Sequence, residues 1–359
     1  MKRERILILL DHMAVGGAAR VTSLLLEHLA ETGVEVVFAT DNVNCDTFYP
    51  VPKEIRTIAF PAKCKGLPIF KQVKLIASAR KIIRNEKPVL VIAVTFAPFF
   101  YAYFASLGTG IPVVAYDHTS FTRKMGVFAD FILYHLYKKA DNLVLLTKKD
   151  SRIVQDYIPH NTLIYNPLTY HINKNEGHLE KAVLCAGRLD SWDVKGFDRI
   201  IVMWSEIKET FPDWKLVIAG GGNDEAKDYL RSLSEEHGVG DCVEFLGQIE
   251  DMASVYERFP IFALPSRVEG FPMVLLEAIS QGCVCVSFEM DGAVREMTDE
   301  TASFIIPDND EKKFVAGLCD AMRMYPDYEK EKQEGWMLCS RFSRDSFNRS
   351  WDEFLKRYL

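Results

Sequence analysis

The sequence lacks the marks of a secreted, membrane-spanning or cysteine-based metal protein. Its eight cysteines form no CxxC pair and show no regular spacing, so we interpret them as reduced residues of a protein core. No segment reaches the roughly 18 consecutive apolar residues that a membrane helix needs. The charged start, residues 1–11, is too short for a signal peptide. These absences predict a cytoplasmic protein, and they leave peripheral contact with the inner face of the cytoplasmic membrane as an open alternative.

A strongly basic overall charge is also missing, since the formal net charge is −7, and this argues against nucleic-acid binding. The charge is unevenly distributed: residues 1–168 hold 21 Lys and Arg against 14 Asp and Glu, whereas residues 169–359 hold 22 against 36. Much of the basic charge lies around one segment with interspersed apolar residues, at Lys63, Lys65, Lys71, Lys74, Arg80, Lys81, Arg84 and Lys87. This segment is either a solvated helix face or a patch that meets anionic lipid head groups or an anionic acceptor.

Short apolar runs alternate with helical patterns along the whole chain, which is typical of α/β proteins. At 359 residues the chain is longer than one core usually grows. The polar, patternless residues 171–178 suit a linker. We therefore predict two doubly wound, Rossmann-like domains, residues 1–170 and 171–340, that face a central cleft. Residues 341–359 are amphipathic, and we expect them to form a C-terminal helix that packs back on the N-terminal domain.

Small or polar residues follow the predicted strands. They are the candidates for a site, because ligands bind at the carboxyl ends of parallel strands. The presence of such a residue after each strand favours a cleft enzyme over a structural protein. They include Gly16, Gly17 and His118 in the N-terminal half, and Arg188, Gly220, Gln248 and Glu269 in the C-terminal half. Taken singly, each has another interpretation. Arg188 and Lys195 could hold a diphosphate or form surface salt bridges, and His118 could be structural.

The stretch from 262 to 278 is the most informative in the chain. A buried-looking strand leads into a polar loop with Glu269, and Pro272 then suits the first position of a helix. Backbone N–H groups at a helix N-terminus bind anions. Glu277, five positions into this helix and about 7.5 Å along its axis, stands among apolar residues. An ionised carboxylate there needs a partner such as a sugar hydroxyl.

In this order along the chain, several short motifs resemble those of the family 4 retaining glycosyltransferases, which have the GT-B fold. They are Gly16-Gly17, Gly187-Arg188-Leu189, Lys195-Gly196, Ile218-Ala219-Gly220, Phe245-Leu246-Gly247, Pro265-Ser266, the segment from Glu269 to Ala278, and Glu296. The segment from Glu269 contains the family's Glu-x7-Glu signature. One spacing departs from the family pattern, since five residues instead of three separate Gly-Arg-Leu from Lys-Gly.

The resemblance implies a role for each matched position. Arg188 and Lys195 would hold the diphosphate and the leaving group of a donor, with Gly16, Gly17 and Gly220 close by. Glu269 and the backbone at Gly270, Phe271 and Met273 would hold the donor sugar, which His118 would contact from the N-terminal half. Glu277 would bind the nucleotide ribose, and Gln248 would border the base. Glu269, His118, Arg188 and Lys195 are the candidate catalytic residues.

The resemblance also implies a function, in which a sugar moves with retention from a nucleotide diphosphate, UDP-linked by expectation, to a saccharide or lipid-linked saccharide. The setting would be the synthesis of lipopolysaccharide, O-antigen or another surface glycan. We expect no cofactor and no metal ion, because Arg188 could neutralise the phosphates. Two alternatives stay open. One is a nucleotide-sugar sensor without transferase activity, and the other is an NAD-dependent oxidoreductase that uses the first βαβ unit with Asp41 as its ribose acid.

Overall fold

The structure is a computed structural model. It describes residues 4–13, 16–41, 49–61, 68–122, 125–173, 180–290, 294–299, 301, 303–325, 327 and 329–359. Lys63 and Lys65 of the basic segment and two cysteines, Cys45 and Cys64, lie outside the described residues. The chain divides into two compact units. Unit 1 consists of residues 1–167 and 345–359, and unit 2 consists of residues 168–344.

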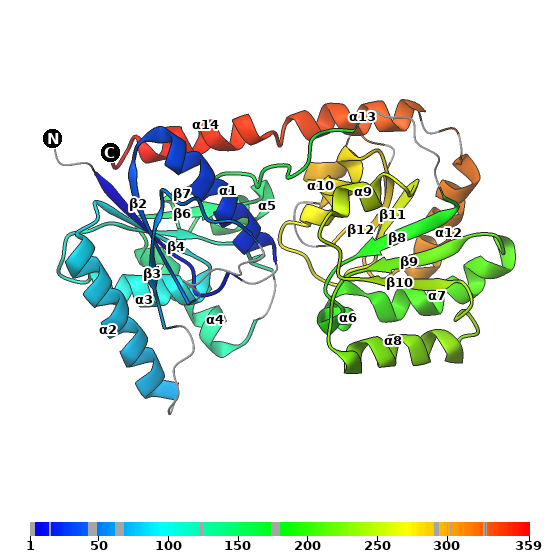
Figure 1. The fold of residues 1–359 in the computed structure, drawn as a ribbon, viewed down its shortest axis with the longest axis horizontal. Helices are drawn as coiled ribbons and strands as arrows, with labels where there is room; N and C mark the ends of the chain where they lie inside the picture. The colour runs from blue at the N-terminus through cyan, green and yellow to red at the C-terminus, as the bar shows by residue number, and fades with distance from the viewer. Residues whose placement is uncertain are drawn as a thin grey trace. The chain divides into compact units, whose positions relative to one another are not determined.

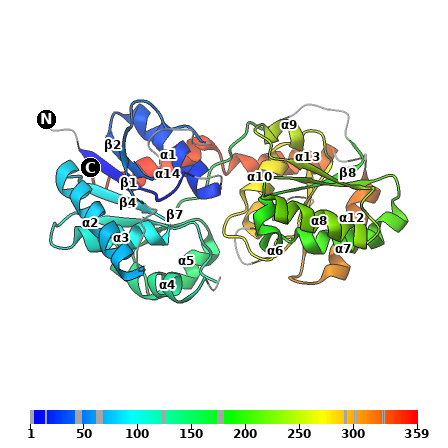
Figure 2. The ribbon, with the colours of Figure 1, turned by 60° about the horizontal axis from the view of Figure 1, so that its bottom comes forward.

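Unit 1 is built on a seven-stranded parallel sheet with the order β3-β2-β1-β4-β5-β6-β7. The strands are β1 (Arg5–Leu9), β2 (Glu35–Thr40), β3 (Arg56–Ala59), β4 (Leu90–Val94), β5 (Val113–Tyr116), β6 (Asn142–Leu145) and β7 (Asn161–Leu163). The helical segments are α1 (Gly17–Thr32), α2 (Pro68–Glu86), α3 (Phe96–Ser106), α4 (Val127–Phe131), η1 (Ile132–Leu136), η2 (Tyr137–Lys139), α5 (Lys148–Val154) and α14 (Arg344–Leu355). Figures 1 and 2 show α1 and α14 on one face of the sheet and α2, α3 and α4 on the other.

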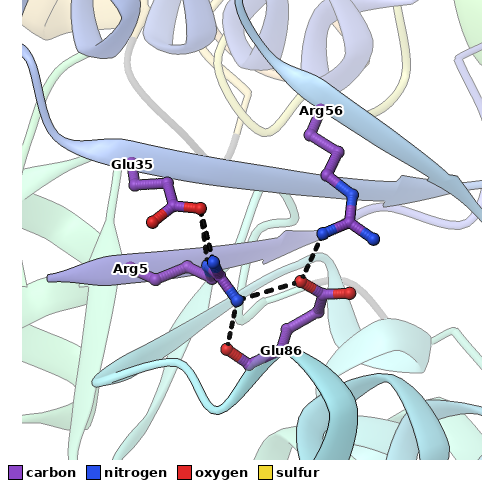
Figure 3. A network of polar contacts seen from close by, with 4 residues as sticks. All are labelled: Arg5, Glu35, Arg56 and Glu86. Atoms are coloured by element: carbon purple, nitrogen blue, oxygen red, sulfur yellow. Dashed lines mark hydrogen bonds and ion pairs between the residues drawn. The ribbon is translucent and has the colours of Figure 1, made fainter. Parts of the chain in front are cut away.

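A charged network ties together the amino-terminal edge of the unit 1 sheet (Figure 3). The carboxylate of Glu86, at the end of α2, lies 3.1 Å from Arg5 Nη1 and 2.9 Å from Arg56 Nη1, and Arg5 Nη2 lies 2.5 Å from Glu35 Oε1. The four side chains come from the starts of β1, β2 and β3 and the end of α2. Glu86 is buried and accepts charge-assisted hydrogen bonds from two arginines. We therefore assign this edge a role in stabilising the fold. The opposite, carboxyl edge is the one open to ligands.

Unit 2 is built on a six-stranded parallel sheet with the order β10-β9-β8-β11-β12-β13. The strands are β8 (Ala182–Ala186), β9 (Lys215–Ala219), β10 (Val243–Gly247), β11 (Ile261–Leu264), β12 (Val284–Phe288) and β13 (Phe304–Ile306). The helical segments are η3 (Leu189–Ser191), α6 (Trp192–Lys195), α7 (Phe197–Thr210), α8 (Asp224–Glu236), α9 (Met252–Tyr256), α10 (Met273–Ser280), α11 (Val294–Thr298), α12 (Glu311–Met324) and α13 (Glu329–Ser340). In both views α7 and α8 lie on one face of the sheet and α10 and α13 on the other.

The two sheets confirm the predicted α/β class with two Rossmann-like halves. The strands β4, β8, β11 and β12 are buried along their whole length, because helices cover both faces of each sheet. Residues 345–359 belong to unit 1, where Trp351 of α14 is fully buried and its ring centroid lies 5.0 Å from that of Tyr116. The chain therefore passes from unit 1 into unit 2 and returns to unit 1 near its end.

Candidate active site

The strand order of unit 2 reverses between β8 and β11, which lie side by side although two strands separate them in the sequence. In open α/β sheets ligands bind at such a switch point, outside the carboxyl ends of the strands. The segment after β8 contains Arg188 and Lys195, and the segment after β11 contains Glu269. The topology therefore brings to one edge the residues that the sequence analysis identified separately.

Glycines at the ends of β8, β9 and β10 let the backbones approach closely. A Cβ atom on Gly220 would lie 1.7 Å from the Gly187 carbonyl oxygen, so only glycine fits there. The Gly220 N–H donates to the Gly247 carbonyl at 2.8 Å. Gln248, exposed just after β10, lies against the next glycine, because its Oε1 is 2.9 Å from the position of a Cβ on Gly221. Gly220 and Gln248 thus shape the backbone edge beside the switch point.

Lys195 and Glu269 form an ion pair at this edge. Lys195 Nζ lies 2.8 Å from Glu269 Oε1, which also accepts a hydrogen bond from Ser266 Oγ at 2.8 Å. The two side chains are 23% and 11% exposed, so water only partly screens the pair. The five residues between Gly-Arg-Leu and Lys-Gly fold into η3 and α6, and this compact turn brings Lys195 to Glu269. Ser266 is a site residue that the sequence analysis did not single out by role.

Arg188 is exposed just after β8, and within the described residues its guanidinium has no hydrogen-bond or ion-pair partner. The surface salt bridge considered for Arg188 is therefore not found there. A guanidinium at the switch point offers a planar set of N–H donors that matches phosphate oxygens.

A buried arginine that the sequence analysis missed supports the loop between β11 and α10. Arg199 of α7 is 5% exposed. Its Nε and Nη2 donate to the carbonyl oxygens of Pro265 and Ser266 at 2.5 and 2.6 Å, and its guanidinium lies 4.0 Å from the centre of the Phe288 ring. Burial lowers the pKa of this guanidinium to about 10, so Arg199 stays charged at neutral pH. It holds the backbone on which Glu269 sits.

The helix that follows Glu269 begins one residue later than predicted. α10 starts at Met273, and Pro272 precedes it as the N-cap, with φ −74° and ψ 82°. The Met273 N–H donates to the Phe271 carbonyl at 2.9 Å, so in this structure the amide expected to meet the donor sugar has an internal partner. Phe271 is buried, and its ring lies 6.1 Å from that of Phe342. Gly270 lies between Glu269 and this anchored ring.

Glu277 is buried inside unit 2, with 3% of its surface exposed. Its Oε1 accepts a hydrogen bond from Thr169 Oγ1 at 2.8 Å, and its Oε2 accepts one from the Tyr256 hydroxyl at 3.2 Å. The predicted requirement for hydroxyl partners around this carboxylate is thus met from within the chain in this structure.

In unit 1, Gly16 and Gly17 stand at the start of the first helix. Gly16 is the N-cap of α1, with extended backbone, and both glycines are exposed. Among the described residues nothing lies within 4 Å of a Cβ built on Gly16. No described residue covers the helix start, and the N–H groups of a helix N-terminus favour an anion.

His118 follows β5 at the carboxyl edge of the unit 1 sheet. Its ring centroid lies 4.3 Å from that of Tyr116, and burial lowers the pKa of the imidazole to about 3. Its Nε2 is buried and has no hydrogen-bond partner among the described residues. Since a neutral imidazole donates from one nitrogen and accepts at the other, His118 can bind a hydroxyl but does not supply positive charge at neutral pH.

Asp117 shares the buried surroundings of His118. Burial raises the pKa of its carboxyl to about 7, although the Thr119 hydroxyl donates to it at 2.6 Å and favours the charged form. Asp117 is therefore partly protonated near neutral pH. A buried carboxyl that titrates there is typical of functional sites.

Neither a metal centre nor a membrane span is found in the described part of the chain. No group of three or more His, Cys, Asp or Glu side chains in it is arranged to hold a metal ion. No described helix is both long and apolar enough to cross a membrane.

Both halves of the sequence match glycosyltransferase families. Residues 15–169 match the family model described as Glycosyltransferase Family 4, and residues 180–324 match the one described as Glycosyl transferases group 1. An uncharacterized glycosyltransferase of Haemophilus influenzae is 27% identical over 321 residues, which cover 85% of this chain and 86% of that protein. The UDP-Gal:α-D-GlcNAc-diphosphoundecaprenol α-1,3-galactosyltransferase of Escherichia coli is 24% identical, over 74% of each chain.

The fold is similar to that of solved glycosyltransferase structures. A sucrose-phosphate synthase from Thermosynechococcus elongatus matches with a TM-score of 0.85 over 99% of each chain, at 17% sequence identity. Identity this low supports the fold alone.

Proposed function

The chain belongs to the family 4 and group 1 glycosyltransferases with the GT-B fold, and from this we propose that it moves a sugar from a UDP-linked donor, with retention, to a saccharide or lipid-linked saccharide. The observation that carries the proposal is the Lys195–Glu269 pair with Ser266, placed at the switch point of unit 2 beside Arg188. The E. coli relative is named for a UDP-galactose donor and a diphosphoundecaprenol-linked acceptor, which supports the UDP and the lipid-linked acceptor proposed here.

Transfer from a nucleotide diphosphate requires stabilisation of the charge on the departing phosphate and on an oxocarbenium-like carbon. In the proposal Arg188 and Lys195 bind the phosphates, so no resident metal ion is required, and Gly220 lets the backbone come close. In unit 1, Gly16 and Gly17 are proposed to offer the start of α1 to phosphate oxygens. Positive charges and helix N-termini that the fold already holds in place stabilise the negative charge of the leaving group, and they need not move during the reaction.

Glu269 is proposed to hold the donor sugar and not to attack it. Its carboxylate is already bound by Lys195 and Ser266, which suits a positioning group better than a free nucleophile. The acceptor hydroxyl then attacks from the front face, its oxygen bonds to the anomeric carbon as the bond to the phosphate oxygen breaks, and its proton passes to that phosphate. Gly270, Phe271 and Met273 complete the proposed sugar site of unit 2, and the neutral His118 is the proposed hydroxyl-binding group of unit 1. For the Met273 N–H to bind the sugar, its hydrogen bond to the Phe271 carbonyl has to open.

The function is tested with purified full-length protein and a panel of UDP-, GDP- and ADP-sugars. We expect a UDP-sugar to raise the melting temperature, because a ligand that binds only the native state stabilises it. NMR of the product formed with a saccharide acceptor should show the anomeric configuration of the donor. Binding without consumption would favour the sensor, and an inverted product would overturn retention. The oxidoreductase alternative is wrong, since both halves match glycosyltransferases.

The setting we propose is surface glycan synthesis at the inner face of the membrane, with contact through α2. Phe70 and Val73 are 61% and 59% exposed, and Lys74, Lys81 and Arg84 are exposed on the same stripe of this helix. Positions spaced by three or four residues share one helix face. An apolar N-terminal turn followed by basic side chains suits an anionic bilayer.

Replacing Lys74 and Lys81 together by glutamate is expected to weaken binding to vesicles with anionic phosphatidylglycerol by about 25-fold or more, because each basic residue near such a surface contributes about 1 kcal/mol. Co-sedimentation at low salt measures the effect. The control replaces Arg231 and Lys312, two exposed basic residues of unit 2, by glutamate. Equal losses in both variants would show that the contact depends on net charge and not on α2.

A further inference from the structure

Glu277 is held by two hydroxyl groups that come from different parts of unit 2. Thr169 lies just after the boundary between the units and 108 residues before Glu277 in the sequence, and its Oγ1 donates to Oε1 at 2.8 Å. Tyr256 is the last residue of α9, and its hydroxyl donates to Oε2 at 3.2 Å. Each carboxylate oxygen thus accepts a hydrogen bond from at least one hydroxyl, and these contacts constrain the orientation of the carboxylate plane.

The Tyr256 hydroxyl is suited to donate. Its side chain is 1% exposed, and burial together with the negative charge of Glu277 raises the pKa of this phenol well above its usual range. Tyr256 therefore keeps its proton. Its ring packs between Tyr170 and Phe262, with centroids 6.4 and 5.7 Å away, so its position is set by the core.

Thr169 is fixed by the backbone on which it stands. The Leu168 N–H donates to the Phe342 carbonyl at 2.6 Å, and the Asn173 N–H donates to the Ser280 carbonyl, at the end of α10, at 3.1 Å. Between them, Gln281 Nε2 donates to the His171 carbonyl at 2.8 Å. The segment 168–173 is therefore attached to the helix that carries Glu277, and the Thr169 hydroxyl is held in place before any ligand binds.

We propose that Thr169 and Tyr256 are positioning residues that set the Glu277 carboxylate to recognise the cis-diol of the donor's ribose. The proposal rests on the proposed function, which assigns Glu277 to that ribose. Adjacent hydroxyls of a cis-diol present two donors to two carboxylate oxygens, and the fit depends on the plane of the carboxylate. Each carboxylate oxygen has two acceptor positions, so a hydroxyl from the chain and one from a ligand can share it.

A role in recognition differs measurably from a role in folding. If the two hydroxyls only satisfied a buried carboxylate, their removal would weaken the binding of every nucleotide equally. If they orient the carboxylate, their removal weakens the binding of ribonucleotides more than that of 2′-deoxyribonucleotides, which offer the carboxylate one hydroxyl instead of two. The discriminating quantity is therefore the ratio of the two dissociation constants.

The experiment uses full-length protein with Thr169→Val, Thr169→Ser or Tyr256→Phe, and titration calorimetry with UDP, GDP and ADP and their 2′-deoxy forms. For the base that binds, we expect the wild type to prefer the ribose form. Thr169→Val and Tyr256→Phe should each lower that preference by about 3- to 10-fold, the usual effect of one hydrogen bond. Thr169→Ser keeps the hydroxyl and should restore the preference. Thermal unfolding of each variant checks the fold, and the Val and Ser pair carries the test if Tyr256→Phe does not fold.

Two failures are distinguishable. If the wild type binds ribose and deoxyribose forms of every base equally, the assignment of Glu277 to the ribose is wrong, and the proposal fails with it. If the wild type prefers ribose and Thr169→Val keeps the same ratio, the positioning role is wrong while the proposed function stands.

Discussion

Replacing Glu269 by glutamine is expected to lower kcat for sugar transfer by about 10²- to 10³-fold, the loss typical of removing one preorganised group that stabilises a transition state. In the structure Glu269 Oε1 accepts from both Lys195 Nζ and Ser266 Oγ at 2.8 Å. Glutamine keeps the shape of the side chain but loses the charge that holds Lys195. Initial rates with a UDP-sugar measure kcat, and calorimetry with UDP is expected to show nearly unchanged nucleotide binding.

The control for this variant is Glu250→Gln, at an exposed glutamate in the loop after β10. It should retain full activity. An unchanged kcat in Glu269→Gln would remove Glu269 from the sugar site. Recovery of a glycosyl group bound to Glu269 by mass spectrometry of the wild type would instead replace the front-face mechanism by one with a covalent intermediate.

Replacing Gly196 by alanine is expected to lower the free energy of unfolding by about 3 kcal/mol or more. Gly196 has φ +69°, and a Cβ there would lie 2.0 Å from the Pro265 carbonyl oxygen. The left-handed conformation costs an L-residue about 1–2 kcal/mol, and the clash adds about 1–3 kcal/mol of overpacking. Because the same carbonyl accepts from Arg199, the loop that carries Glu269 should also shift. Chemical denaturation measures the stability, and transfer rates measure the shift.

Gly238 provides a matched control for this substitution. Its φ of +67° is nearly the same, but among the described residues nothing lies within 4 Å of a Cβ built on it. Gly238→Ala should therefore cost only the conformational part, about 1–2 kcal/mol. Equal losses in the two variants would show that the contact with Pro265 contributes nothing.

Local sequence patterns were sufficient to predict the α/β class and the loop-to-helix segment around Glu269. Apolar runs form buried parallel strands, and Pro272 marks the start of a helix within one residue. Such patterns depend on neighbours along the chain. The groups that hold the site in place come from distant parts of the sequence. Thr169 is 108 residues from Glu277, and Arg199 is 66 residues from Pro265. Nothing in the local sequence of either residue distinguishes it from an ordinary linker threonine or helix arginine.

The environment of His118 shows the same limit. The sequence places it after a strand, but its neighbour Tyr116 packs against Trp351, which lies in α14 at the other end of the chain. The packing of Tyr116 and Trp351 is part of the buried surroundings of His118, and this burial keeps the imidazole neutral. A lone histidine in the sequence gives no information about its protonation state, which depends on side chains brought together only by folding.

The discontinuity of unit 1 has a consequence for how the protein is made. Translation delivers all of unit 2, residues 168–344, before it delivers residues 345–359. Until those residues arrive, Tyr116 has no Trp351 to pack against, and one face of the unit 1 sheet lacks α14. A chain that stalls or is cut before residue 345 thus contains all of unit 2 up to its last residue and a unit 1 sheet with an uncovered apolar face, the kind of surface that chaperones bind and proteases reach.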